Sequence, residues 1–569
     1  MSLLGKRWQI YEQNLALCQS LSKELEISPV TAQVLLNRGI SDVNEANKFL
    51  DPRLSYLSDP MDIQDMAKAA QRIFLARERG EKVVVYGDYD VDGVTGTVIL
   101  LEVLEIIGIK SSYYIPHRYK EGYGMNGDAI KKIKNDGVAL IITVDCGISN
   151  LVEIELANSL GIDVIVTDHH NVPNKLPKAA ALVNPKLIKG SHPSQELSGA
   201  GVAFKFAWAL FRLAGINDSA LLMDMLDLVG LGTIADVVPL LDENRILATQ
   251  GLSLINQRKR IGLRHLAEVA GLYGRISTKH VNFALAPRIN AAGRLEHASL
   301  SVDLLLEEED GRARELAEKL SKINSERQNI GGRIAEEADF ELGKGDLDGT
   351  KFLMLSGSDW HPGVIGIVAS KIVDKYYRPT ILVGINDGEG RGSARSIDGF
   401  NIYELLERTG DLFLDFGGHE AAAGFKIKPE NVPELKRRLE KEIENLIAPE
   451  ELIPKAKIDA EINPNDITMG FIKELEALNP HGSANPTPIF LTRGLKLTEI
   501  RRLGSDGAHL KLKFSTQGTL LDTIGFRLGS LEERLSCGKS YDIAYSLGTN
   551  VWNGFETAEL SLVDLREAG

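Results

Sequence analysis

Short apolar runs rich in β-branched residues alternate with longer stretches of helical periodicity from residue 81 onward. The stretches EKVVVYGDYD, ALIITVDCGIS and IDVIVTDHH each show the apolar run of a buried strand followed by polar residues. Between them, TGTVILLEVLEIIG and NLVEIELANSLG have the length and apolar content of helices. Strands that alternate with helices indicate βαβ units, so we predict an α/β fold with a parallel sheet.

The same patterns divide the rest of the chain into further segments. Before residue 81, MAKAAQRIFLARERG has helical spacing and ends at Gly80. A highly charged stretch with thin apolar periodicity predicts a long connecting helix, and strands alternate with helices again after it. From about residue 455, short strands separated by turn residues are typical of a small β-barrel such as an OB-fold, or of a sandwich fragment. The predicted segments are an N-terminal helical extension at 1–80, a parallel-sheet domain at 81–302, the connecting helix at 303–345, a smaller α/β domain at 346–448 and the barrel at 449–569.

Composition narrows the class of protein. The chain has 569 residues, 43% hydrophobic and 25% charged, as soluble globular proteins do. No apolar run approaches the roughly 18 residues that span a membrane, and the N-terminus lacks the apolar core of a secretory signal. The 3 cysteines are far apart and form no CxxC pair. We therefore expect a cytoplasmic protein with no membrane partner and no disulfide framework.

The net charge of −14 says less about partners. It argues weakly against nonspecific nucleic-acid binding, which depends on clustered Lys and Arg. A metal site built from carboxylates would itself add negative charge that bound cations cancel. The total therefore excludes no nucleic-acid substrate.

Acidic residues follow the C-terminal ends of the predicted strands. Open α/β sheets bind their ligands at this edge, so we expect these segments to converge. Asp236, in GLGTIADVVPL, follows a mostly helical stretch, and spacing alone does not place it near the others. The residues at the strand ends are Asp88, Asp90 and Asp92, then Asp145, then Asp168, His169 and His170.

The alternating aspartates Asp88, Asp90 and Asp92 fit a metal site better than the alternatives. An EF-hand loop would need a bidentate Glu at its twelfth position, which here is Ile99, and a helix where this chain has a strand. Acids that only cap a helix or face solvent would need no metal. Carboxylates this close repel one another unless cations hold them, and oxygen ligands with an imidazole suit Mn²⁺ or Mg²⁺. Two such ions about 3.5–4 Å apart would serve phosphoryl transfer.

Nine motifs carry a resemblance to a known family. The chain resembles the DHH phosphoesterase superfamily in four of them, in order: GDYDVDGVTGT, TVDCGIS, TDHH and GLGTIADVVPL. It is similar to the single-strand-specific 5′→3′ DNA exonucleases of that superfamily in five more: LAPRINAAGRLEHASLSVDLLL, SKINSERQ, WHPGVIGIVASKI, GRGSARS and FGGHEAAAGF. The resemblance implies a DHH catalytic domain at 81–302, a DHHA1 substrate-binding domain at 346–448 and an OB-fold at 449–569. It also implies an exonuclease of DNA repair and recombination that uses two Mn²⁺ or Mg²⁺ ions and releases 5′ mononucleotides.

The resemblance further implies roles for residues of the metal site. Those that match metal ligands are Asp90, Asp92, Asp145, His169 and Asp236. Asp145 would bridge the two ions, and Asp88 would be a further ligand or support one. Asp168 would orient the histidine beside it, and His170 would face the scissile phosphate. Asp145, His169 and His170 are thus the predicted catalytic residues.

A pocket for the terminal 5′ phosphate is the second site that the resemblance implies. In GRGSARS, small residues let backbone N–H groups approach phosphate, with Ser393 and Arg395 as donors, although a flexible glycine hairpin explains the motif equally well without the resemblance. Arg288 and Arg118 would complete the pocket, which would explain the 5′→3′ polarity by blocking the passage of DNA beyond its end. The residues expected to contact substrate or order these loops are Asn290, Arg294, His361 and His419.

Some alternatives stay open at the level of sequence. Smaller DHH proteins hydrolyse pyrophosphate, cyclic dinucleotides or short RNA, but the long connector and the barrel argue against so small a substrate. A replication-fork scaffold without cleavage would lose metal-site acids that are intact here. Four aromatic residues of the last domain would either stack bases or fill the barrel: Phe490, Phe514, Trp552 and Phe555. The expected partners are single-stranded DNA at its 5′ end, a helicase and a single-stranded-DNA-binding protein.

Overall fold

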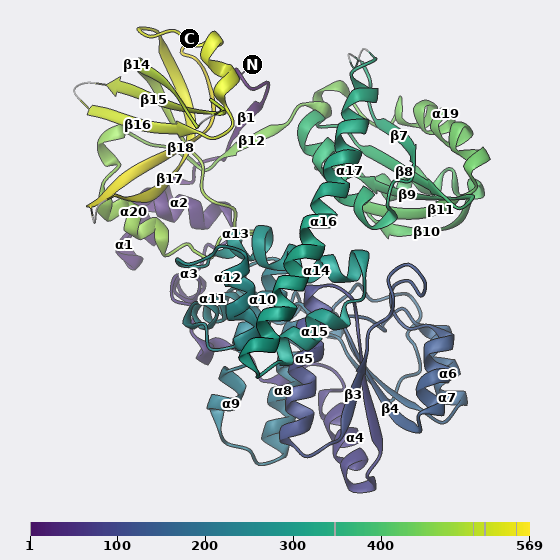
Figure 1. Cartoon of the computed structure of the whole chain (residues 1–569). Helices are drawn as coiled ribbons and strands as arrows, with labels where there is room; N and C mark the ends of the chain where they lie inside the picture. Colours follow the sequence, from purple (N-terminus) through teal and green to yellow (C-terminus); the bar gives the residue numbers. More distant parts are fainter. Residues whose placement is uncertain (1, 346, 348, 505, 517–518, 553–554) are drawn as a thin grey trace. The chain divides into compact units, whose positions relative to one another are not determined.

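The computed structural model describes residues 2–345, 347, 349–504, 506–516, 519–552 and 555–569 (Figure 1). The chain forms two compact units. The parallel-sheet unit comprises residues 42–325 and 477–487, and the barrel unit comprises 2–41, 326–476 and 488–569. The N-terminal extension expected at 1–80 is divided between them, since residues 2–41 belong with the barrel unit and 42–80 with the sheet. Among the described residues, no helix is long and apolar enough to cross a membrane.

A five-stranded parallel sheet organises the first of these units, as the alternating pattern predicts. Alternate residues of its strands belong to two separate apolar clusters, one on each face. On one face lie α6 (Gly127–Asn135) and α7 (Leu151–Ser159), and on the other lie α4 (Met66–Arg79), α5 (Val91–Ile106) and α8 (Gly199–Leu213) (Figure 1). The strand order is β3 (Ser111–Tyr114), β2 (Lys82–Gly87), β4 (Val138–Val144), β5 (Asp163–Thr167) and β6 (Ala181–Val183).

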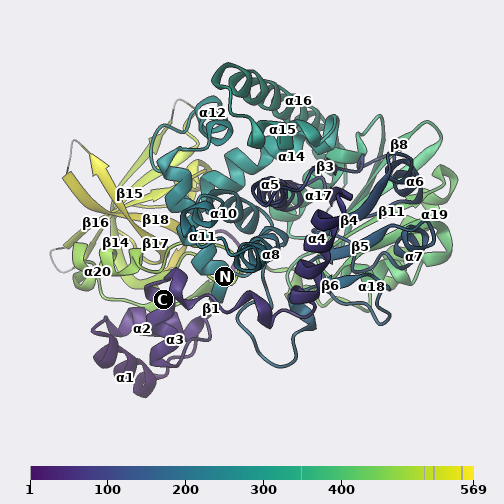
Figure 2. The ribbon, with the colours of Figure 1, turned by 90° about the horizontal axis from the view of Figure 1, so that it is seen from below.

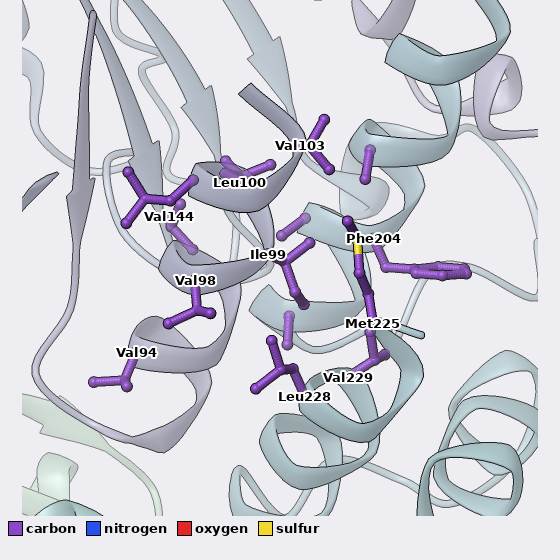
Figure 3. Close-up of a cluster of buried hydrophobic side chains, with 14 of the residues drawn as sticks. Val94, Val98, Ile99, Leu100, Val103, Val144, Phe204, Met225, Leu228 and Val229 are labelled. Carbon is purple, nitrogen blue, oxygen red and sulfur yellow. The ribbon is translucent and has the colours of Figure 1, made fainter. Parts of the chain in front are cut away.

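Helix α5 is enclosed almost completely. Figure 3 shows Val98 on the side of Val144 of β4, and Ile99 on the side of Leu228 of α10 (Leu226–Ala235). The side chains of Val98 and Ile99 have no exposed surface, which is typical of a helix that is apolar all round. Figure 2 also shows α8 and α10 beside α5. This packing fixes the N-terminus of α5, where Asp90 and Asp92 lie.

Helix α10 contacts α5, α8 and α11 (Asp242–Gln257) in the parallel-sheet unit. A Cβ atom on Gly230 of α10 would lie 2.7 Å from the Cα of Gly251, so α10 and α11 approach to backbone contact. A long helix was expected at 303–345, and the 33-residue helix α16 (Asp310–Leu342) lies within that range. Residues 303–306 instead end the preceding helix α15 (Ser299–Leu306). The remaining elements are α3 (Val43–Leu50), α9 (Ser219–Met223), α12 (Ile261–Val269), α13 (Thr278–His280), a π-helical turn (Val281–Leu285) and α14 (Ala286–Leu295).

The smaller α/β domain contains a second five-stranded sheet, which is mixed. Its strands β7 and β8 are parallel, and the other neighbours are antiparallel. Helices α17 (Pro362–Tyr376), α18 (Ile402–Glu407) and α19 (Val432–Ile443) accompany it. The strand order is β10 (Phe413–His419), β11 (Ala422–Ile427), β9 (Glu389–Arg395), β8 (Thr380–Asn386) and β7 (Leu353–Ser358).

The C-terminal strands close into a five-stranded barrel, which confirms the predicted OB-fold. Two short strands before the barrel lie outside the closed ring: β12 (Lys455–Ile458) pairs with β1 (Arg7–Ile10), and β13 (Ala460–Glu461) pairs with the start of β14 (Phe490–Leu503). The N-terminal helices α1 (Leu15–Leu25) and α2 (Pro29–Asn37) and helix α20 (Met469–Glu476) belong to the same unit. The barrel strands are β14, β15 (His509–Thr516), β16 (Thr519–Gly525), β18 (Phe555–Glu567) and β17 (Ser540–Trp552).

The proposed base-stacking aromatics of the barrel have a different place. Phe490 and Phe514 have no exposed surface and form part of the barrel core, so they cannot stack on bases. Alternating side chains of a small barrel fill its interior, which explains their burial. The side chains of Trp552 and Phe555 lie outside the described part of the structure.

Candidate metal centre and substrate-binding residues

Strand register brings three acidic segments together. Gly87 of β2 pairs with Val144 of β4, which in turn pairs with Thr167 of β5. The next residue on each strand is an aspartate: Asp88, Asp145 and Asp168. Because neighbouring strands are about 4.8 Å apart, these residues lie side by side at the carboxyl edge of the sheet.

The loop after β2 uses its aspartates in two ways. Asp90 caps α5, since its Oδ1 accepts hydrogen bonds from the backbone N–H groups of Asp92 (3.0 Å) and Gly93 (3.1 Å). The capping interpretation is therefore correct for one carboxylate oxygen of Asp90. Asp92 points the other way and accepts hydrogen bonds from Gly199 N and from Ala200 N (2.9 Å), at the start of α8. The N-termini of α5 and α8 thus both meet at this cluster of carboxylates, which they favour electrostatically.

Asp236 joins the same cluster, although its spacing did not place it there. It follows α10 as the helix C-cap, and its Oδ2 lies 3.5 Å from His169 Nε2. The same nitrogen lies 3.0 Å from Asp145 Oδ1 and 3.9 Å from Asp92 Oδ2. Carboxylates that follow two strands, β2 and β4, and one helix, α10, therefore surround the Nε2 of His169.

Three sets of potential ligand atoms have mutual distances within 4.8 Å. Asp145 and His169 each belong to two of the sets, so the three sets form one connected cluster. Among the described residues, the buried atoms Asp88 Oδ1, Asp145 Oδ1 and His169 Nε2 accept or donate no hydrogen bond. Buried polar atoms nearly always have a partner, so three such atoms in one site suit a bound cation. The sets are Asp88, Asp90 and Asp145; Asp92, His169 and Asp236; and Asp145, His169 and His170.

The ionisation of the cluster also suits a cation. Burial, and then the charge of Asp90, raises the pKa of Asp92 to about 7. Burial, and then the charges of Asp92 and Asp90, raises the pKa of Asp236 to about 9. Burial and the neighbouring carboxylates likewise raise the pKa of Asp145 and of Asp88. Divalent cations would favour the ionised forms that burial and repulsion otherwise disfavour.

His169 has the properties of a neutral ligand. Burial, and then the neighbouring His170, lowers its pKa to about 3, so the imidazole is neutral at physiological pH. A hydrogen bond with the backbone of Leu197 opposes this shift and holds the ring. Metal-binding histidines commonly have such a second partner.

His170 is held differently from the expectation. We expected Asp168 to orient the ring of His169, but its Oδ1 lies 2.8 Å from Nδ1 of His170 instead. From His169, Asp168 accepts a hydrogen bond of the backbone N–H (2.8 Å) and none of the ring. The same carboxylate also accepts the backbone N–H groups of His170 and Ile148, which holds it beside the His170 ring. Burial alone would lower the pKa of His170, but the hydrogen bond and charge of Asp168 raise it.

Tyr123 is a site residue that the sequence did not single out. Its hydroxyl donates a hydrogen bond to the backbone carbonyl of Asp145 (2.8 Å) and lies 3.1 Å from His170 Nδ1. Because the Tyr123 hydroxyl donates its proton to the carbonyl of Asp145, the hydroxyl oxygen can act only as an acceptor toward His170. Tyr123 stands in IPHRYKEGYG, the segment that also supplied Arg118, but nothing in its spacing indicates this contact.

Two of the predicted substrate-binding arginines belong to the parallel-sheet unit. The guanidinium of Arg118 lies 4.6 Å from the ring centroid of Tyr89, in the loop between Asp88 and Asp90. Arg288 donates to the carbonyl of Ala284 (2.7 Å) and to Ser321 Oγ (3.4 Å). Asn290 and Arg294 lie on the same helix α14, and its Gly293 packs closely against the carbonyl of Tyr89.

The other predicted substrate contacts lie on the sheet of the smaller α/β domain. Arg395 Nη1 donates to Ser393 Oγ at 3.0 Å. Arg395 pairs with Ala422, which pairs with His419, so the three side chains share one face of the sheet. His361 instead caps α17 and accepts the backbone N–H of Gly363 at 3.1 Å. Because Ser393 and Arg395 belong to the barrel unit, their sharing of one pocket with Arg118 and Arg288 stays a prediction.

The chain is similar to known proteins over nearly its whole length. The chain matches the family models for the DHH family N-terminal domain at residues 82–233, the DHHA1 domain at 349–445 and the RecJ OB domain at 458–564. It is 40% identical over 561 residues to the single-stranded-DNA-specific exonuclease RecJ of Bacillus subtilis, covering 98% of this chain and 70% of that protein. It is 34% identical over 558 residues to the RecJ of Escherichia coli, covering 94% and 95% of the two chains.

A solved structure agrees over nearly the whole length. The crystal structure of Thermus thermophilus RecJ in complex with Mn²⁺ superimposes with a TM-score of 0.85 and 33% identity, covering 99% of this chain and 80% of that one. The similarity thus includes the DHH domain, the DHHA1 domain and the barrel. The chain therefore belongs to the RecJ family.

Proposed function

We propose that this protein is a single-stranded-DNA-specific exonuclease, a metal-dependent hydrolase that releases 5′ mononucleotides from the 5′ end. The observation that carries the proposal is the metal centre itself, in which five aspartates and two histidines meet and three buried ligand atoms form no hydrogen bond. The relatives that match nearly the whole chain are named as such exonucleases. A role in DNA repair and recombination, and a cytoplasmic location, accord with a DNA substrate.

Two Mn²⁺ or Mg²⁺ ions are the cofactors of this proposal. Related RecJ structures contain Mn²⁺ or Mg²⁺, and the donor set of carboxylates with one neutral imidazole suits these metals. Bound here, the ions would polarise the phosphodiester and activate the attacking water. Asp88, Asp90 and Asp145 would hold one ion, and Asp92, His169 and Asp236 the other. Asp145 Oδ1 lies 3.0 Å from His169 Nε2 of the second set.

The protein's own groups orient the substrate phosphate. Asp168 and Tyr123 hold Nδ1 of His170, which leaves Nε2 for the substrate. The raised pKa of His170 favours its cationic form, which donates a hydrogen bond to a phosphate oxygen. Asp145, with φ +59, bends the chain so that its carboxylate faces His169 while its carbonyl meets Tyr123.

Recognition of the 5′ end forms the second part of the proposal. Ser393 and Arg395, already within hydrogen-bonding distance of each other, would bind the terminal phosphate together with Arg118 and Arg288. Asn290 and His419 would contact the adjoining backbone. The expected substrate is DNA that is not paired with a complementary strand. A helicase would therefore separate the strands, and a single-stranded-DNA-binding protein would present the unpaired one.

Replacing Asp145 tests the metal assignment. The Asp145→Ala variant should lose Mn²⁺ binding in calorimetry and all measurable cleavage of single-stranded DNA. Cys146→Ala is the matched control, because Cys146 is the next residue and is equally buried but faces the backbone carbonyl of Tyr86 at 3.8 Å. Undiminished cleavage by a pure Asp145→Ala preparation would refute the assignment.

A further inference from the structure

The backbone is strained directly beside the metal centre. Val237, the residue after Asp236, has φ +62 and lies in the left-handed region. Glycine and asparagine adopt this conformation readily, whereas it is a genuine outlier for a β-branched side chain. Within the described part of the chain, Val237 is the only β-branched residue with a positive φ.

Burial does not offset this strain. Val237 is 61% exposed, so it contributes little to the apolar core of the protein. A valine that is both strained and exposed lowers the stability of the folded protein, and no apolar burial offsets this loss. Strain of this kind accumulates at functional sites, where the surrounding structure maintains it.

The contacts on either side of Val237 explain why the backbone turns here, but they do not explain why the residue at the turn is a valine. Before the turn, the carboxylate of Asp236 is directed at His169. After it, Asn244 Nδ2 donates to the carbonyl of Pro239 (3.1 Å), and Leu240 N donates to the carbonyl of Ser483 (2.9 Å). Both ends are fixed, so a turn is needed here, but glycine or asparagine would make it with less strain. A reason for the valine must therefore lie in its side chain.

We propose that Val237 contacts the substrate, packing its exposed methyl groups against the apolar face of the nucleoside next to the scissile phosphate. This inference rests on the proposed function. Consecutive Cα atoms are about 3.8 Å apart, so Val237 borders the residue that would hold one of the ions. The side chain of Asp236 is itself 22% exposed, so the cluster opens to solvent at this point.

The contact would supply what the metal centre lacks. Carboxylates, imidazoles and cations bind phosphate and offer nothing to the sugar or the base. The deoxyribose ring and the faces of the bases are apolar, and an aliphatic side chain binds them without regard to base sequence. Val237 would therefore hold each successive nucleotide over the metals while leaving the enzyme indifferent to sequence.

Steady-state kinetics on 5′-phosphorylated single-stranded DNA with Mn²⁺ test the contact. Val237→Ala and Val237→Gly should each raise KM by about 3- to 10-fold with kcat within about 2-fold, since one lost apolar contact weakens ground and transition states alike. Val237→Ile should keep the wild-type KM. Glu26→Gly is the control for relief of strain alone, because Glu26 also has a left-handed φ of +55 but caps the exposed end of α1 in the other unit.

Two further measurements separate the outcomes. Mn²⁺ affinity should be unchanged in all Val237 variants, whereas a parallel loss of Mn²⁺ affinity and kcat would show that the residue acts only through Asp236 and would overturn the proposal. DNA with an abasic 5′-terminal nucleotide shows which part of the nucleoside Val237 contacts. If Val237→Ala still raises KM on this DNA, the contact is with the sugar, and if it does not, the contact is with the base. An unchanged KM in both Ala and Gly variants would overturn the inference alone, while a wild-type protein that cleaves no DNA would overturn the proposed function with it.

Discussion

Replacing Asp236 by Asn should stabilise the metal-free protein while it removes a metal ligand. Asp236 has a pKa raised from 3.8 to about 9, first by burial and then by the charges of Asp92 and Asp90. Its side chain is only 22% exposed, so solvent screens these effects weakly. Asn has nearly the same shape and carries no charge at any pH.

The size of the effect follows from proton linkage. Between pH 3.8 and pH 9, the folded metal-free protein holds a proton on Asp236 that the unfolded chain releases, so the folded state loses stability as the pH rises through this window. Each pH unit costs about 1.4 kcal/mol, which gives an upper limit of about 4 kcal/mol at pH 7. The destabilisation is smaller than this limit where neighbouring carboxylates share the proton with Asp236. The stabilisation by Asn should therefore grow with pH, from near zero below the pKa of the unfolded chain.

Thermal and urea unfolding at several pH values would measure this. In EDTA, Asp236→Asn should unfold at a higher temperature than the wild type, by a margin that widens from pH 5 to pH 8.5. Added Mn²⁺ should reverse the order, because only the wild type binds the metal fully. Asp128→Asn, whose side chain is 97% exposed, is the matched control. A margin that is absent, or that does not change with pH, would refute the account of the cluster's electrostatics.

Two further predictions concern residues around the metals. Tyr123→Phe removes the hydroxyl that links the carbonyl of Asp145 to His170 Nδ1. We expect kcat to fall about 10-fold with little change in KM. A pH–rate profile with the shape and height of the wild type would contradict this role. Arg395→Ala should reduce the preference for 5′-phosphorylated over 5′-hydroxyl DNA, measured as a ratio of kcat/KM values. Arg437→Ala, an exposed arginine paired with Glu434 on α19, should leave that ratio unchanged, and an unaltered ratio in Arg395→Ala would remove Arg395 from the pocket.

The parallel sheet and the convergence of its acidic loops could be predicted because both depend on local pattern. The apolar runs of β2, β4 and β5 identify the strands, and parallel strands necessarily place their carboxyl ends at one edge. The register Gly87, Val144, Thr167 then brings Asp88, Asp145 and Asp168 together. Motif resemblance added Asp236, whose place beside His169 depends on how α10 packs against α5.

Contacts set by tertiary packing could not be predicted. The backbone N–H groups of Gly199 and Ala200 reach Asp92 from a helix more than 100 residues away in sequence. The partner of Asp168 depended on the rotamers of two adjacent histidines, and the ring it holds is that of His170. The positive φ of Val237 is imposed by contacts on either side of it and leaves no mark in the sequence.

Cleavage of single-stranded DNA labelled separately at its 5′ and 3′ ends, with and without Mn²⁺ or Mg²⁺, tests whether the protein is a metal-dependent 5′→3′ exonuclease. Duplex DNA and short RNA serve as comparison substrates. The account predicts metal-dependent release of the 5′ label at once as mononucleotide, stepwise shortening of the 3′-labelled strand, and intact duplex. Loss of the 3′ label first, or rapid hydrolysis of dinucleotides with no cleavage of DNA, would contradict it.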